Sequence, residues 1–142
     1  MMRNKDWMML NGTIYRIYTT GDFGRMQRIF LERMRTLIPF DGAIFRLADG
    51  RKGEQVVCGE MIGGEELMSR EPQEGLYDGQ SIVYRETDFA DPAHLQGYGL
   101  RMVLVRNEKF LGTVDFFRSL EREDFQYRDI FLLDMVKEHL AY

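Results

Sequence analysis

The chain is poor in the side chains that most often carry catalysis or bind metal ions. It has one cysteine, Cys58, and two histidines, His94 and His139. A single cysteine excludes an internal disulfide and a cysteine-based metal cluster, and the histidines are not grouped with other ligands at metal-site spacing. The hydrolase motif G-x-S-x-G is absent as well. The sequence therefore predicts no metal site and no catalytic residue, and it indicates no particular cofactor.

The sequence also lacks an excess of positive charge and a long apolar run. Its 19 Lys and Arg stand against 23 Asp and Glu, which gives a net charge of −4. Nucleic-acid surfaces need clustered Lys and Arg, so we expect DNA binding only through a domain absent from this chain. The N-terminal stretch "MMRNKDWMML" has no apolar signal-peptide core. We expect a cytoplasmic protein without membrane contact.

What the sequence does contain is ordinary for a soluble globular domain. Of its 142 residues, 44% are hydrophobic and 30% are charged, and only 3 are proline. A chain of this size can bury one hydrophobic core without disulfides or metals. We expect a single domain over residues 1–142, with N-terminal helices in 5–38, a sheet and pocket segment in 41–118, and a C-terminal connector helix in 126–142.

Helical periodicity marks the N-terminal part. Apolar residues at helical spacing predict a helix over 5–18 and a second one from Asp22, an N-cap residue, to the segment before Pro39. The apolar stripes of the two helices are formed by Trp7, Leu10, Ile14, Ile17 and Tyr18, and by Phe23, Met26, Phe30, Met34 and Leu37.

The pattern then changes to strands. Residues 42–62 read as a β-hairpin, and "LRMVLV" and "KFLGTVDFF" predict a second hairpin, with Asn107 in the turn because it tolerates a positive φ. Between them lie a strand candidate, "SIVYR", and two short helix candidates, at 65–69 and at Asp91-Pro92. Asp129 can bind free N–H groups at the start of the terminal helix. The expected fold is α+β, with five to six mostly antiparallel strands and the helices on one face.

This order, with the stretches "FDGAIFRLADG", "SIVYRETDFADP", "GLRMVLVRNEKFLGTVDFFRS" and "REDFQYRDIFLLDMVKEHLAY", resembles a GAF domain over about residues 21–142. More narrowly, "FLGTVDFFRS" followed by "DFQYRDIFLLDMVKEHLA" is similar to the GAF-like sensor of bacterial transcription regulators with a LuxR-type helix-turn-helix output. The resemblance implies a non-enzymatic sensory module that binds a small molecule, dimerises, or does both, and signals through its last helix.

The terminal helix carries two apolar stripes. Leu132, Leu133, Val136 and Leu140 form one, and we expect it to pack on the chain's own core. Phe131, Met135 and Tyr142 form the other, for which we expect the same helix of a second subunit as the partner. The alternative is that the first two helices of the same chain cover both stripes.

Two charged residues interrupt strands that should be central in the sheet. Arg101 lies in "GLRMVLV" and Asp115 in "LGTVDFF". A two-residue turn alone would place Leu100 opposite Asp115, whereas one bulged residue would place Arg101 there and allow a cross-strand ion pair. Such a pair could hold a small polar ligand in a cavity, or it could lie outward on a solvated sheet edge. The sequence leaves both registers open.

The resemblance places a ligand pocket over the strands and the irregular segment. The pocket candidates are Phe45, Met61, Tyr84, Phe89, Tyr98 and Met102, together with Arg101 and Asp115, and core packing is the alternative role for each of the apolar and aromatic ones. Two other functions stay open at this stage. One is a small thiol-dependent redox enzyme on the same scaffold that uses Cys58, and the other is a ligand-free dimerisation domain.

Overall fold

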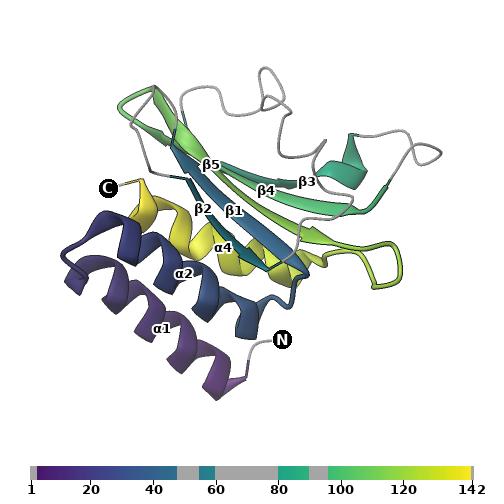
Figure 1. Ribbon diagram of the computed structural model, residues 1–142, viewed down its shortest axis with the longest axis horizontal. Coiled ribbons are helices and arrows are strands. Elements are labelled where there is room, and N and C mark those ends of the chain that lie inside the picture. The colour runs from purple at the N-terminus through teal and green to yellow at the C-terminus, as the bar shows by residue number, and fades with distance from the viewer. Residues whose placement is uncertain (1–2, 48–54, 60–79, 90–95, 142) are drawn as a thin grey trace.

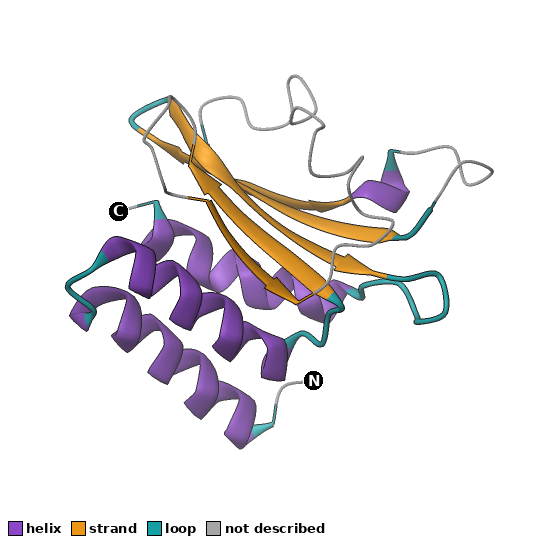
Figure 2. Ribbon diagram, in the orientation of Figure 1, coloured by secondary structure: helices purple, strands orange, loops and turns teal. Residues whose placement is uncertain are grey.

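The computed structural model describes residues 3–47, 55–59, 80–89 and 96–141. Within them the N-terminal helices are α1 (Asn4–Thr19) and α2 (Phe23–Leu37), and the C-terminal helix is α4 (Tyr127–Leu140) (Figure 2). These confirm the three long helices predicted from periodicity, with each end displaced by no more than two residues. The two short helices predicted at 65–69 and 91–92 lie outside the described residues.

Local capping explains where the helices begin. The Asp22 carboxylate accepts a hydrogen bond from the backbone N–H of Arg25 at 2.9 Å, so it caps α2 as expected. At α4 the Asp129 carboxylate accepts the backbone N–H of Gln126 at 2.8 Å, which fixes the first turn. Both acidic groups also lie at the positive end of a helix dipole.

Five antiparallel strands form one sheet in the order β2-β1-β5-β4-β3. Their bounds are Gly42–Leu47 for β1, Gln55–Gly59 for β2, Ile82–Arg85 for β3, Tyr98–Arg106 for β4 and Lys109–Arg118 for β5. Both predicted hairpins are present, as β1 with β2 and β4 with β5. The 3₁₀ turn η1 (Glu86–Asp88) follows β3.

The β4–β5 connection decides the register that the sequence left open. Asn107 and Glu108 form a two-residue turn with φ values of 52° and 63°, as hairpin turns of this length require. Beyond the turn Val105 pairs with Phe110 but Leu104 pairs with Gly112, so Leu111 is an extra, bulged residue. The bulge shifts the remaining pairs by one position and places Arg101 directly opposite Asp115.

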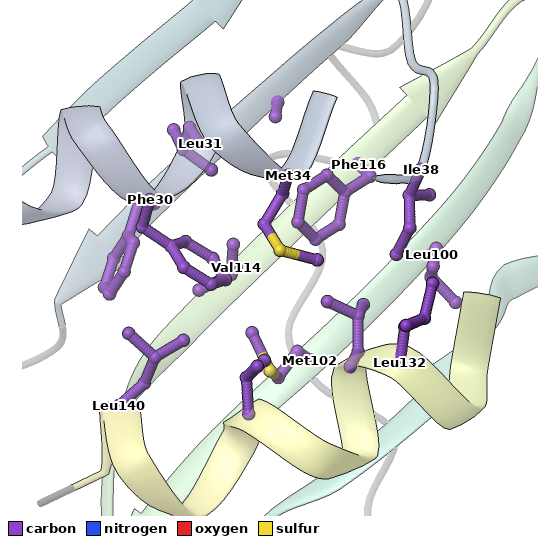
Figure 3. Packing of buried hydrophobic residues seen from close by; sticks show 14 of the residues in the cluster. Phe30, Leu31, Met34, Ile38, Leu100, Met102, Val114, Phe116, Leu132 and Leu140 are labelled. Carbon is purple, nitrogen blue, oxygen red and sulfur yellow. The ribbon is translucent and has the colours of Figure 1, made fainter. Parts of the chain in front are cut away.

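The three long helices lie on the same side of the sheet, where α2 and α4 form a layer against its face and α1 packs on α2 and α4 (Figure 1). The main core lies between these two layers, where side chains of α2 and α4 meet alternate residues of the strands (Figure 3). The first stripe predicted for the terminal helix belongs to this core, since Leu132, Leu133, Val136 and Leu140 are all buried. In the part of the chain that the structure describes, no helix is long and apolar enough to cross a membrane.

Candidate functional site

A row of side chains crosses four strands on the sheet face opposite the helices. Ile44 of β1 pairs with Asp115 of β5, Asp115 with Arg101 of β4, and Arg101 with Tyr84 of β3. Directly paired residues project from the same face of a sheet. We call this set the polar row, and it holds three of the predicted candidates, Tyr84, Arg101 and Asp115.

At the centre of the polar row, Arg101 and Asp115 form a buried ion pair. The Nε of Arg101 donates to Asp115 Oδ1 at 2.6 Å, and Nη2 donates to Oδ2 at 3.3 Å. Both side chains are 0% exposed. The two contacts make a bidentate, charge-assisted pair, the strongest geometry that this combination offers. Of the two registers that the sequence left open, the structure has the one that allows a cross-strand ion pair, and the pair is buried instead of lying on a solvated edge.

The next row on the same face supplies two more groups to Asp115. The hydroxyl of Thr113 donates to Asp115 Oδ2 at 3.3 Å. The Nη2 of Arg46, on β1, lies 3.6 Å from the same oxygen, and its side chain is 28% exposed. One buried carboxylate thus meets two arginines, of which Arg101 is enclosed and Arg46 reaches solvent.

Burial and pairing act in opposite directions on these groups. Burial by itself lowers the pKa of Arg101, but the Asp115 carboxylate, together with the Tyr84 side chain, more than offsets this and leaves the pKa above its ordinary value. Burial raises the pKa of the Asp115 carboxyl above its ordinary value, although Arg101, Arg46 and Thr113 act to lower it. The guanidinium of Arg101 is therefore held charged inside the protein.

Aromatic side chains flank one end of the polar row. Tyr84 is 5% exposed, and its ring meets that of Phe89 edge-to-face with centroids 5.4 Å apart. Phe89 follows η1 and is 49% exposed. These two predicted pocket residues therefore lie together, and Tyr84 is also the cross-strand partner of Arg101.

The remaining predicted pocket residues are not brought to this face. Phe45 and Met102 are fully buried in the core under the helices. The rings of Phe45 and of Phe30 in α2 lie edge-to-face, with their centroids 6.2 Å apart. Tyr98 packs against the same core. These three residues have the core packing that was given as their alternative role, and they are not brought to the polar row, because alternate residues of a strand point to opposite faces. Met61 lies outside the described residues.

The second stripe of the terminal helix meets α1 of the same chain. The ring of Phe131 is 50% exposed and lies edge-to-face to Trp7, at 6.5 Å between centroids. Met135 packs against the main core. Tyr142, the third residue of the predicted subunit contact, lies outside the described residues. Contact within one chain, the alternative to a subunit contact, accounts for part of this stripe, and contact with a second subunit stays a prediction.

The residues considered for other chemistry lie apart from the polar row. Cys58 is a free thiol on β2, partly buried against the helix-side core. His139 of α4 is hydrogen bonded through Nδ1 to the Tyr18 hydroxyl at 2.6 Å. No three His, Cys, Asp or Glu side chains among the described residues are grouped so that they could hold a metal ion.

Sequence reasoning missed an open groove at the end of α4. It has a volume of about 420 Å³ and runs between the start of β3, the β4–β5 turn and the helix end. Its lining includes Ser81, Arg106 and Glu138. The Ser81 hydroxyl both donates to the Val105 carbonyl and accepts from the Val105 N–H, so it serves the strand backbone. No periodicity or motif marks these residues, which come from three distant segments.

The layers, the strand order and the helix positions define an α+β fold of the GAF type. The chain is similar to the GAF domain from a phosphoenolpyruvate-protein phosphotransferase (ptsP) from Coxiella burnetii, with a TM-score of 0.64 and 12% sequence identity over 96% of this chain and 90% of that one. No family model matches the sequence, and no curated protein matches it. At this identity the likeness establishes the fold and leaves the function to be argued from the site.

Proposed function

We propose that this chain is a non-enzymatic sensory module that binds a small polar molecule at the polar row and transmits the bound state through α4. The observation that carries the proposal is the fully buried Arg101–Asp115 pair on two central strands. Removing two charges from water costs more than a sheet gains from them unless the geometry is very good, and apolar residues of similar size often serve stability as well or better. A buried charged pair beside aromatic rings is therefore better explained by recognition than by stability.

Two of the strands that carry the polar row also form the surface on which α4 packs. Arg101 is flanked along β4 by Leu100 and Met102, which point to the opposite face and belong to the core shared with α4 (Figure 3). Helix α4 packs over β3 and β4, the two strands that carry Tyr84 and Arg101. A ligand that repositions Arg101 therefore acts on the strand against which α4 rests, provided that it binds two arrangements of that strand with different affinity.

The finer parts of the proposal concern output and assembly. The resemblance of "FLGTVDFFRS" and of the segment after it to the sensors of LuxR-type regulators favours a transcription regulator as the parent protein. In that setting α4 would lead toward a DNA-binding domain, and two copies would act as a homodimer. These parts rest on the resemblance of the sequence to those regulators, whereas the binding site rests on the geometry of the polar row.

The proposal is tested by asking what the purified protein binds. Native mass spectrometry of protein isolated without added ligand detects a retained molecule, and thermal-shift assays with amino acids, dicarboxylates and nucleobases test for added ones. We expect at least one polar molecule to raise the melting temperature, since binding to the folded state stabilises it by mass action.

The decisive comparison uses the double variant Arg101→Met with Asp115→Leu, which replaces the ion pair by apolar groups of similar size. A control variant, Lys137→Met, removes one partner of an exposed pair on α4, whose nitrogen–oxygen distance is 3.0 Å. Binding should survive in the control and disappear in the double variant. A molecule that binds the double variant as tightly as the natural sequence would refute the assignment of the site.

A further inference from the structure

The outer face of α1 carries large apolar side chains that the described part of the chain leaves more than half exposed, although Tyr18 also contacts His139 of α4. Met8 is 74% exposed, Tyr15 67% and Tyr18 56%. On a helical wheel these three residues, with Asn11, fall within an arc of about 80°. The arc contains no charged residue. The opposite side of α1 buries Leu10 and Thr13, so the outer side is a second face, which the described residues cover only at its edge with α4.

The spacing of this outer face is that of a helix–helix seam. Its members lie at positions 8, 11, 15 and 18, so the intervals alternate three, four and three residues. This is the interval pattern of the contact positions in packed helices of the coiled-coil type. A groove for an extended peptide or a flat contact would not require this spacing, whereas a partner that is itself a helix would.

We infer that α1 forms a homodimer contact by packing this outer face against the same face of α1 in a second copy. The inference extends the proposed function by naming the surface through which two sensors associate, and it moves that surface from the α4 stripe to α1. Phe131 of α4 continues the surface, because its half-exposed ring lies against Trp7 at the edge of the seam. We call Trp7, Met8, Asn11, Tyr15, Tyr18 and Phe131 the α1 seam.

The exposed area is what a dimer of this kind needs. The exposed fractions of the five large side chains in the α1 seam are 37% for Trp7, 74% for Met8, 67% for Tyr15, 56% for Tyr18 and 50% for Phe131. At about 200 Å² for a fully exposed side chain of this size, they present roughly 550–600 Å² per copy. Full burial of these five side chains in both copies would remove about 1,100–1,200 Å² from solvent, which is above the roughly 1,000 Å² that specific interfaces need.

A second copy also fits better than a partner of another kind. A face without charges offers nothing to steer or orient a charged partner. A two-fold axis, by contrast, brings the same uncharged residues together from both chains. The aromatic residues that dominate the α1 seam are also those enriched at the centres of protein interfaces.

The test is the mass of the full chain in solution over a wide concentration range, measured by sedimentation equilibrium and by light scattering. The natural sequence should approach twice the chain mass of 16.8 kDa as its concentration rises. Tyr15→Glu would place carboxylates near one another in the contact and should raise the dimer dissociation constant by at least about 100-fold. Thr36→Glu, which adds the same charge at an exposed position of α2, should leave the constant unchanged.

Asn11→Arg provides a second variant of the α1 seam if Tyr15→Glu does not fold, as judged by circular dichroism. A natural chain that stays monomeric at the highest concentration would overturn the inference, and so would a folded Tyr15→Glu that dimerises like the control. Neither measurement uses a ligand, so the proposed binding site can fail or survive independently.

Discussion

The buried ion pair of the polar row yields a quantitative prediction about the two single substitutions. Arg101 and Asp115 have no exposed side-chain surface and share two hydrogen bonds. Removing one partner of such a pair leaves an uncompensated buried charge, which typically costs about 3–5 kcal/mol of unfolding free energy. Replacing both partners with apolar residues of similar size leaves stability within about 1–2 kcal/mol of the natural protein, or raises it.

The surroundings make the two single variants unequal. In Arg101→Met the carboxylate of Asp115 keeps the Thr113 hydroxyl at 3.3 Å and Arg46 at 3.6 Å. In Asp115→Leu the enclosed guanidinium of Arg101 loses its carboxylate and keeps the side chain of Tyr84, a hydrogen-bonding group without a full negative charge. We therefore expect Asp115→Leu to be the more destabilising single change, by about 1 kcal/mol or more.

The assay is urea unfolding of the natural protein, the two single variants and the double variant, followed by circular dichroism. The coupling free energy of this double-mutant cycle should reach about 3 kcal/mol or more. A parallel cycle on the exposed pair Asp134 and Lys137 should give only about 0.2–1 kcal/mol. Additive effects at Arg101 and Asp115, or a larger loss for Arg101→Met than for Asp115→Leu, would refute the reasoning.

Three further predictions concern local features. The backbone N–H of Arg3 lowers the pKa of Asp6 below its ordinary value of 3.8, with Arg128 adding to the effect. The ionised Asp6 carboxylate therefore stabilises the fold above pH 3.8, and this contribution is lost as the pH falls through the lowered pKa. Asp6→Asn should reduce the decline of the urea midpoint on the acid side. Glu108→Gly should stabilise the protein by about 0.5–1 kcal/mol, because Glu108 adopts a φ of 63° that glycine adopts without strain; an unchanged melting temperature would contradict this. Cys58, partly buried against the core, should be alkylated more slowly in the folded protein than in urea, and rapid labelling of the folded state would instead favour the thiol-enzyme alternative.

Much of the fold is readable from the sequence, since its signals are local. The Asp22 cap, the stop before Pro39 and the apolar stripe of α2 depend on neighbouring residues alone, and all of them appear in the structure. The β4–β5 register cannot be read in this way. It depends on the bulged residue Leu111, and because Phe110 and Leu111 are both apolar, the sequence does not show which of them faces the helices. One residue thus decides whether Asp115 meets Leu100 or Arg101.

The division of the predicted pocket residues between two faces of the sheet has a different cause. Met102 follows Arg101 directly, and Phe45 follows Ile44, so the two members of each pair must point to opposite faces of the sheet. Strand periodicity alone is therefore enough to separate the helix-side residues from the polar row. For α4, periodicity correctly identifies two stripes, but it contains no information about which helix covers the second one. That contact with α1 joins segments more than a hundred residues apart in the chain.

The position of α1 links the two proposals physically. It contacts α4 near both ends, through the ion pair of Asp6 with Arg128 at 3.2 Å and through the hydrogen bond of Tyr18 with His139. Helix α4 in turn rests on β3 and β4, whose opposite face carries Tyr84 and Arg101. A change at the polar row that shifts α4 must therefore either carry α1 with it or break these contacts. If α1 also holds the second copy, the bound state of the site and the strength of dimerisation are coupled, and linkage requires that each alters the other by the same factor.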